Sequence, residues 1–148
     1  MNADISIEEQ GIRIKGKPLQ GCNLDLNNTP DALPSLAVLG CFAHGTTTLV
    51  NVAQARIKET DRIKVMAEEL SKMNADIKER EEGLIIHKST LKRNKVRGHS
   101  DHRIVMALSL AGLIADGKTE ITTAESIDVT YPTYIKSMKS LGAKMEVV

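Results

Sequence analysis

Aromatic residues are scarce in this 148-residue chain, which contains two tyrosines, one phenylalanine and no tryptophan. Recognition of single-stranded nucleic acid depends on bases that stack on aromatic side chains, and this chain offers almost none. An excess of one charge is also lacking, because 20 Lys and Arg stand against 19 Asp and Glu. This balance excludes the strong basic field of a nucleic-acid binder. The sequence predicts no nucleic-acid partner, and a core built from Leu, Ile, Val, Ala and Met.

Long hydrophobic runs and cysteine clusters are lacking too. No apolar run reaches the roughly 20 residues of a membrane span, so we expect no membrane partner and a cytosolic protein. Cys22 and Cys41 are far apart and have no partner motif, which is typical of reduced, buried thiols. The spacing of His44, His87 and His99 does not suggest a metal site. The sequence predicts no metal and no cofactor.

An internal repeat organises the 148 residues, which suffice for one domain of two packed layers. The sequence MNADI at residues 1–5 recurs letter for letter at 73–77, and a weaker echo begins at Leu141. The chain therefore holds two repeat units and little more. Residue 1 aligns with residue 73, where an expected helix ends. We therefore expect the chain to be part of a longer protein.

Each unit is predicted to run enclosed helix, strand, surface helix and hairpin, in an α/β layered fold. Segments that are apolar all round predict buried helices, and apolar residues spaced by three and four predict amphipathic ones. Short strand-like segments on either side of a glycine turn predict hairpins. The expected elements are hairpins over 3–15 and 75–88, enclosed helices over 32–42 and 104–114 with Gly45 and Gly117 as C-caps, strands over 46–50 and 119–122, and surface helices over 63–73 and 134–141.

Cationic side chains lie where the expected helices begin. Lys58 and Arg62 precede the first surface helix, and Arg103 precedes the second enclosed helix. A cation there opposes the positive end of the helix dipole at a cost of about 0.3–1 kcal/mol. The free N–H groups of the same helix start attract anions. A bound phosphate or carboxylate would satisfy both, so the sequence predicts an anion site.

Simpler interpretations of the same residues stay open. Asp31 and Asp101 are of the type that caps helix N-termini. Lys58 and Arg62, four residues apart on one face, could pair with neighbouring carboxylates on a solvated surface. His102 could be a half-exposed imidazole beside a cap.

Two motifs carry a resemblance to a known family. Lys-Glu-Thr-Asp-Arg at 58–62, followed by Asp-His-Arg at 101–103, resembles the signature of the C-terminal domain of the 5-enolpyruvylshikimate-3-phosphate synthase family. Thr-Pro-Asp at 29–31 and the sequence at 44–49 are also similar, and the resemblance covers essentially the whole chain. It implies two domains, each of three βαβαββ units with enclosed helices. Residues 1–148 would be about two units of the C-terminal domain.

The resemblance also implies an activity. Family members transfer the enolpyruvyl group of phosphoenolpyruvate to the 5-hydroxyl of shikimate 3-phosphate and release phosphate. Asp31 and Glu59 would be the catalytic carboxylates that accept and donate protons around a tetrahedral intermediate. Lys58 would belong to the catalytic set and, together with Asp31, contact the shikimate hydroxyls.

Four further residues would bind substrate on the same resemblance. Arg62 and Arg103 would clamp phosphoenolpyruvate, because the planar guanidinium matches phosphate and carboxylate groups. Gln54 stands where family members often carry an amide. His102 lies inside the Asp-His-Arg motif.

The chain departs from the family pattern in two respects. Val129 stands where many members carry a lysine that binds phosphoenolpyruvate. The residues of the N-terminal domain that hold the substrate phosphate have no counterpart. We therefore expect the isolated chain to be inactive, with the missing N-terminal domain as its partner. Apolar surface exposed at the cut edge would favour self-association.

Two other functions stay open. The chain could be a noncatalytic module that binds anions or assembles with a partner. It could also belong to the related transferase that acts on UDP-N-acetylglucosamine. The Lys-Glu-Thr-Asp-Arg motif favours the shikimate branch.

Overall fold

The computed structural model describes residues 1–148 as a layered α/β protein. The strands are β1 (Asp4–Glu8), β2 (Gly11–Lys15), β3 (Asn23–Asp25), β4 (Thr46–Val50), β5 (Asp76–Arg80), β6 (Gly83–His87), β7 (Lys95–Arg97) and β8 (Glu120–Thr122). The α-helices are α1 (Leu33–Phe42), α2 (Arg62–Lys72), α3 (His102–Ile114) and α4 (Tyr134–Ser140). The 3-10 helices are η1 (Pro30–Ala32), η2 (Ala53–Ile57) and η3 (Ala124–Val129). None of these helices combines the length and the apolar composition that a membrane crossing requires.

The helices and hairpins expected from the sequence are present, which confirms the α/β interpretation and the order of the repeat unit. The second enclosed helix begins at His102 rather than at Ile104, because the Asp101 side chain accepts from the backbone N–H groups of its first turn. The short strands β3 and β7 were not expected, since three residues carry too little pattern to be recognised.

The prediction that Gly45 and Gly117 cap the enclosed helices is wrong. Helices α1 and α3 end earlier, and the C-cap residues Ala43 and Ala115 are already extended. The two glycines lie further on, at φ +83° and +92°, in the turns that lead to the next strand. Glycine is used there for the left-handed turn between helix and strand, not for the helix end itself.

The repeat extends to backbone conformation. Residues with positive φ recur 72 positions later, in the pairs Asn2 and Asn74, Gly45 and Gly117, and Asn51 and Thr123. The weaker copy of the repeat that begins at Leu141 also has a counterpart in the structure. The N–H of Ala75 reaches the carbonyl of Leu70 after α2, and the N–H of Ala143 reaches that of Met138 after α4. Both surface helices therefore end in the same turn.

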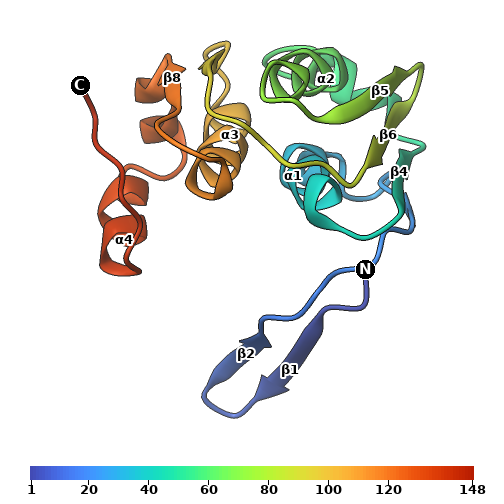
Figure 1. Cartoon of the computed structure of the whole chain (residues 1–148), viewed down its shortest axis with the longest axis horizontal. Helices are drawn as coiled ribbons and strands as arrows, with labels where there is room; N and C mark the ends of the chain where they lie inside the picture. Colours follow the sequence, from blue (N-terminus) through green and yellow to red (C-terminus); the bar gives the residue numbers. More distant parts are fainter.

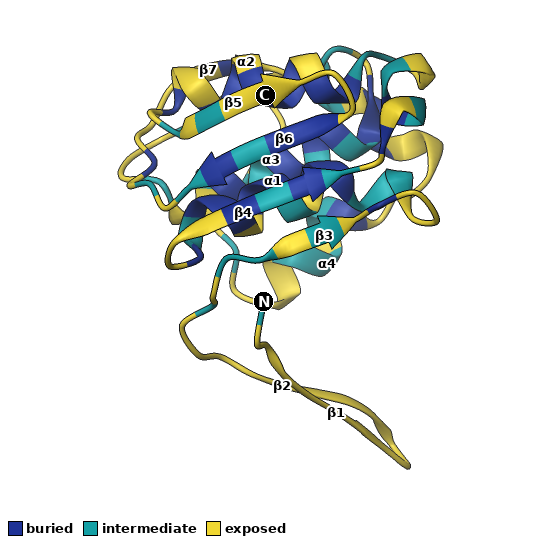
Figure 2. Ribbon diagram, turned by 90° about the vertical axis from the view of Figure 1, so that its right-hand side faces the viewer, coloured by how far each residue is buried: buried dark blue, intermediate teal, exposed yellow.

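The central sheet has the strand order β3-β4-β6-β5 (Figure 1). Strands β3 and β4 are parallel, whereas β6 pairs antiparallel with both β4 and β5. Strands β7 and β8 form a separate parallel pair, and β1 and β2 form an antiparallel hairpin that projects from the body (Figures 1 and 2). The first unit thus has a four-stranded sheet. The second unit has a sheet of two strands, β7 and β8.

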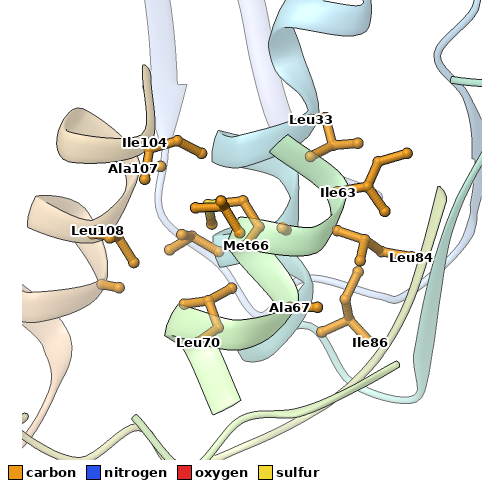
Figure 3. Packing of buried hydrophobic residues seen from close by; sticks show 14 of the residues in the cluster. Leu33, Ile63, Met66, Ala67, Leu70, Leu84, Ile86, Ile104, Ala107 and Leu108 are labelled. Atoms are coloured by element: carbon orange, nitrogen blue, oxygen red, sulfur yellow. The ribbon is translucent and has the colours of Figure 1, made fainter. Parts of the chain in front are cut away.

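Helix α1 is enclosed, as its uniformly apolar sequence predicts. It contacts α2, α3, β4 and β6. Leu33 on α1 belongs to one buried cluster with Met66 of α2, Ile86 of β6 and Leu108 of α3 (Figure 3). Cys41 is buried there, and burial raises the pKa of its thiol to about 12. The expectation of unpaired thiols is confirmed, although Cys22 is only half-buried.

Gly83, at the start of β6, is expected to tolerate no side chain. A Cβ there would lie 1.9 Å from the carbonyl oxygen of Leu49, a backbone atom that cannot move aside. We expect Gly83→Ala to lower the free energy of unfolding by about 1–3 kcal/mol through overpacking. Gly16→Ala is the matched control, because nothing lies within 4 Å of its added Cβ. Equal urea midpoints for the two variants would contradict this expectation.

Candidate functional site

Arg62 lies at the centre of a buried ion cluster. Helix α2 begins at this residue because Asp61 caps it by accepting from the backbone N–H of Lys64. The Arg62 side chain is only 1% exposed, and it donates four hydrogen bonds to three carboxylates. Its Nη1 donates to Asp31 at 2.7 Å and its Nη2 to Glu59 at 2.6 Å. A guanidinium is suited to this place because it offers five donors in a fixed plane.

Asp101 joins this cluster from the second repeat unit. Its carboxylate is fully buried and accepts from Arg62 Nε at 2.7 Å and Nη2 at 3.2 Å. The same carboxylate accepts from the backbone N–H of Arg103 and caps α3. Burial would lower the pKa of Arg62, but the hydrogen bonds and charge of Asp101, with the charges of Glu59 and Asp31, raise it. One ion pair therefore fixes the starts of α2 and α3 against each other.

Three cations converge on Asp31, which lies in η1 just before α1. Arg62 Nη1 is 2.7 Å from its carboxylate, Arg103 Nη2 is 3.2 Å away and Lys58 Nζ is 3.7 Å away. Partial burial would raise the pKa of Asp31, but Arg103, Lys58 and Arg62 outweigh it and lower that pKa. The Asp31 side chain caps no helix, since η1 has no side-chain cap. The capping interpretation therefore fails for Asp31.

Glu59 and His102 lie beside this centre. Glu59 accepts from Arg62 with Oε2, and its Oε1 is 3.8 Å from Nδ1 of His102. The Glu59 carboxylate is 47% exposed, whereas the His102 ring is buried. His102 is thus more enclosed than the half-exposed imidazole considered from the sequence. One carboxylate oxygen is held by the arginine, and the other lies toward the imidazole.

The cluster is electrically balanced as it stands. Lys58, Arg62 and Arg103 contribute three positive charges, and three carboxylates offset them. These carboxylates supply a partner for cations that oppose the helix dipoles, without a guest anion. Lys58 and Arg103, whose side chains are 33% and 39% exposed, are the cations able to turn toward a ligand.

The structure brings together six of the seven site residues predicted from the sequence. Gln54 is the exception, because its amide donates to the backbone carbonyl of Asn27 at 2.7 Å and makes no hydrogen bond with the cluster. The expectation that Lys58 and Arg62 share a helical face is wrong, since Lys58 lies in the extended turn after η2. They come together only because both reach Asp31.

Asp101 is the site residue that sequence reasoning missed. The sequence predicts a helix cap at Asp101, and the structure confirms it, but the cap gives no sign of the partner on α2. The available signal was its place in Asp-His-Arg, directly before a helix that is apolar all round. A carboxylate in such a place is buried with the helix start and needs a cationic partner. No group of three or more His, Cys, Asp or Glu side chains is placed to hold a metal ion.

A second buried carboxylate supports the loop that carries Asp101. Glu69 of α2 is 1% exposed and accepts from His99 at 2.9 Å, from the backbone N–H of Arg97 at 2.9 Å and from Lys72 at 2.7 Å. Burial would raise the pKa of Glu69, but the hydrogen bonds from Lys72 and His99 outweigh it and lower the pKa. Glu69 therefore fixes the segment between β7 and α3.

We expect Glu69→Gln to lower the free energy of unfolding by about 1–3 kcal/mol at pH 7, since charge-assisted hydrogen bonds are lost. A lowered folded-state pKa means that this contribution is complete above the usual value of 4.5 and is lost as the pH falls through the folded pKa. The difference between the parent and the variant should therefore shrink below pH 4.5. Glu68→Gln, on the exposed neighbour, is the control. Denaturant titrations from pH 7 to pH 3 test this, and a difference independent of pH would contradict it.

The comparisons with known proteins agree on one family. Residues 1–138 match the family model described as EPSP synthase (3-phosphoshikimate 1-carboxyvinyltransferase). The chain is 54% identical to the 3-phosphoshikimate 1-carboxyvinyltransferase of Ruminiclostridium cellulolyticum over 148 residues, all of this chain and 35% of that protein. It is 47% identical to the protein of the same name in Methanococcus vannielii over 152 aligned positions, again all of this chain and 35% of the relative.

Solved structures of enolpyruvyl transferases also match this chain. An EPSP synthase from Acinetobacter baumannii matches with a TM-score of 0.92 and 32% identity, over all of this chain and 38% of that one. The enolpyruvyl transferase NikO from Streptomyces tendae matches with a TM-score of 0.81 at 20% identity, over 97% of this chain and 33% of that one, and shares the fold. The chain thus spans about a third of the length of the curated relatives it matches.

Proposed function

Because the chain belongs to the EPSP synthase family, we propose that it supplies part of the active site of a 3-phosphoshikimate 1-carboxyvinyltransferase. The proposed reaction transfers the enolpyruvyl group of phosphoenolpyruvate to the 5-hydroxyl of shikimate 3-phosphate and releases phosphate. The observation that carries the proposal is the convergence of Lys58, Arg62 and Arg103 on Asp31. Residues 1–148 are proposed to be part of the C-terminal domain, and a cytosolic location stays a prediction.

Asp31 is suited to the role of proton acceptor. Three nearby cations lower its pKa, so its carboxylate is ionised at neutral pH. An ionised carboxylate can take the proton of the attacking 5-hydroxyl. Lys58, which lies beside Asp31, is proposed to hold the hydroxyls of the same sugar ring in place.

Glu59 is suited to the role of proton donor. Its carboxylate is half-exposed and therefore open to a ligand, while Arg62 fixes one of its oxygens. The other oxygen, 3.8 Å from Nδ1 of His102, is free of a hydrogen bond and is proposed to hand its proton to the substrate. The two carboxylates share Arg62 as a neighbour, which keeps both within reach of one substrate.

Arg103 is proposed to bind the phosphate or carboxylate of phosphoenolpyruvate. It is the more exposed of the two arginines, and its contact with Asp31 is longer than that of Arg62. Arg62 already donates four hydrogen bonds, so it reaches phosphoenolpyruvate only by exchanging a carboxylate partner. Because the charges of the cluster are balanced, holding two anionic substrates would require further cations from outside this chain. We therefore propose that the isolated chain is inactive.

A chimeric enzyme tests this function. The corresponding third of the Ruminiclostridium cellulolyticum relative is replaced by this chain, and phosphate release from phosphoenolpyruvate is followed with shikimate 3-phosphate as acceptor. We expect turnover within about tenfold of the relative, and none above background for the isolated chain. A folded chimera that is inactive would contradict the proposal.

The two alternative functions are distinguished by the same proteins. A noncatalytic anion module predicts tight binding of phosphoenolpyruvate by the isolated chain, which the balanced charges of the cluster argue against. Calorimetry with the isolated chain measures that binding. A transferase for UDP-N-acetylglucosamine predicts that the chimera turns over that acceptor instead.

A further inference from the structure

Two neighbouring residues just before the Asp-His-Arg motif have a strained backbone. His99 and Ser100 have φ of +55° and +56°, in the left-handed region that is uncommon for residues other than glycine. The N–H of Asp101 donates to the carbonyl of Gly98 and closes a four-residue turn around them, here called the left-handed turn. Positive φ at both central residues is the pattern of a type I′ turn, in which Asn-Gly is preferred. His-Ser is therefore an unfavourable local sequence for this turn.

The repeat indicates that the local sequence does not set this conformation. The equivalent turn of the first unit has the same hydrogen bond, from the N–H of Thr29 to the carbonyl of Leu26. Its central residues Asn27 and Asn28 are of a type that tolerates the left-handed region, yet neither has a positive φ. A strained conformation persists only where its surroundings hold it. Contacts from outside the left-handed turn must therefore fix its shape.

Helix α2 holds this segment at two points. Arg62, at the start of the helix, donates to the Asp101 carboxylate. Glu69, two helical turns later, accepts from His99 at 2.9 Å and from the backbone N–H of Arg97 at 2.9 Å. Residues seven apart share one face of a helix and are separated by about 10 Å along its axis. Two contacts this far apart fix the direction of the segment as well as its position.

The left-handed turn has partners on its other side as well. The N–H of Gly98 donates to the carbonyl of Thr122, and the N–H of Ser100 donates to Oγ1 of Thr123. These partners belong to the same repeat unit as the turn, whereas Glu69 belongs to the first unit. The Glu69 side chain is almost fully buried by this chain alone, so its contact needs no other part of a longer protein. Loss of its carboxylate would free the turn from the first unit and leave its contacts near β8.

We propose that Glu69 is a positioning residue for Arg103 and acts through His99 and the left-handed turn, a role that rests on the proposed binding of phosphoenolpyruvate by Arg103. Arg103 follows the turn, and its backbone N–H donates to the Asp101 carboxylate at 2.9 Å. Its partly exposed side chain has one ion pair, with Asp31 at 3.2 Å. The place of the guanidinium therefore depends on the backbone that carries it, and the turn sets that backbone.

Three changes separate this role from a purely structural one. Glu69→Gln removes the carboxylate that holds the turn. Lys72→Gln is the matched control, because Lys72 is bonded to the same carboxylate and not to the turn. His99→Asn with Ser100→Gly supplies the preferred sequence of a type I′ turn, which should keep its shape without Glu69. Adding Glu69→Gln to this pair gives the rescue variant, and circular dichroism establishes that each variant is folded.

Amide hydrogen exchange of the chain, followed by NMR, reports on the turn without catalysis. Glu69→Gln should speed exchange of the Asp101 and Arg103 amides at least about tenfold more than that of the core strand β6. The N–H of Ile86, which is fully buried in β6, is the reference. Local opening gives unequal changes, whereas a global loss of stability speeds all protected amides alike. Lys72→Gln should change the three amides equally, and the rescue variant should restore the parent pattern. Equal acceleration in Glu69→Gln overturns the proposal.

Kinetics of the chimeric enzyme test the link to the substrate. Glu69→Gln should raise KM for phosphoenolpyruvate about tenfold and leave kcat and KM for shikimate 3-phosphate within about twofold, because the displaced arginine binds one substrate. Lys72→Gln should match the parent, and the rescue variant should recover the parent KM. An active chimera whose KM is unchanged by Glu69→Gln overturns the proposal. An inactive parent chimera contradicts the proposed function instead, and the exchange measurement then decides whether Glu69 positions the turn.

Discussion

Arg62→Ala is expected to lower the free energy of unfolding by about 3–5 kcal/mol, the range seen when one partner of a buried ion pair is removed. The variant leaves Asp101 fully buried without a cationic partner. It also leaves Glu59 without its hydrogen bond and removes the closest cation from Asp31. The starts of α2 and α3 lose the contact that joins them.

Urea titration at pH 7 measures this loss. Arg103→Ala is the control, because Arg103 is partly exposed and contacts the same Asp31 carboxylate. It should cost no more than about 1 kcal/mol, as exposed ion pairs do. Arg62→Lys should fall between the two variants, since an ammonium keeps the charge but not the fork of donors. A loss below about 1 kcal/mol for Arg62→Ala would show that Asp101 finds another partner.

Asp31→Asn is expected to lower the turnover of the chimeric enzyme by about 10²–10⁴-fold, the usual contribution of a positioned general base. An amide keeps the size of the side chain but cannot accept the proton of the attacking hydroxyl. The amide also removes the negative charge at which Lys58, Arg62 and Arg103 converge. The kcat should fall more than KM rises if the lost interaction acts in the transition state.

Asp25→Asn is the matched control for this experiment. Asp25 is an exposed carboxylate at the end of β3, bonded to Asn27 and Asn51 and outside the cluster. Its replacement should leave turnover within about twofold of the chimera. If Asp31→Asn turns over as fast as Asp25→Asn, the assignment of Asp31 as proton acceptor fails.

The fold could be predicted from the sequence because the signals repeat. The enclosed helices are apolar on all sides, and the hairpins are marked by Gly11 and Gly83 in equivalent places. Each observation in one unit was supported by its copy in the other. The helix C-caps were placed wrongly because a glycine after a helix serves equally for the helix end and for the next turn.

The site could be predicted only in part, because its contacts join residues far apart in the chain. The motifs placed Asp31, Lys58 and Arg62 among the candidates, and the structure brings them together. The partner that buries Arg62 is Asp101, which is 39 positions away and was assigned only as a cap. Hydrophobic periodicity in the sequence cannot predict an ion pair between two residues that are so far apart in the chain. Gln54 was expected at the site, but its amide donates a hydrogen bond to the backbone carbonyl of Asn27.

The ion pair between Asp31 and Arg103 joins positions that are copies of each other, 72 residues apart in a duplicated chain. When a segment is duplicated and its two copies pack side by side, equivalent positions can come to face each other. Identical residues there would set two like charges in contact. Opposite charges turn the same geometry into an attraction. The two copies of the repeat therefore carry opposite charges at the place where these positions meet, and a polarised centre follows from that difference.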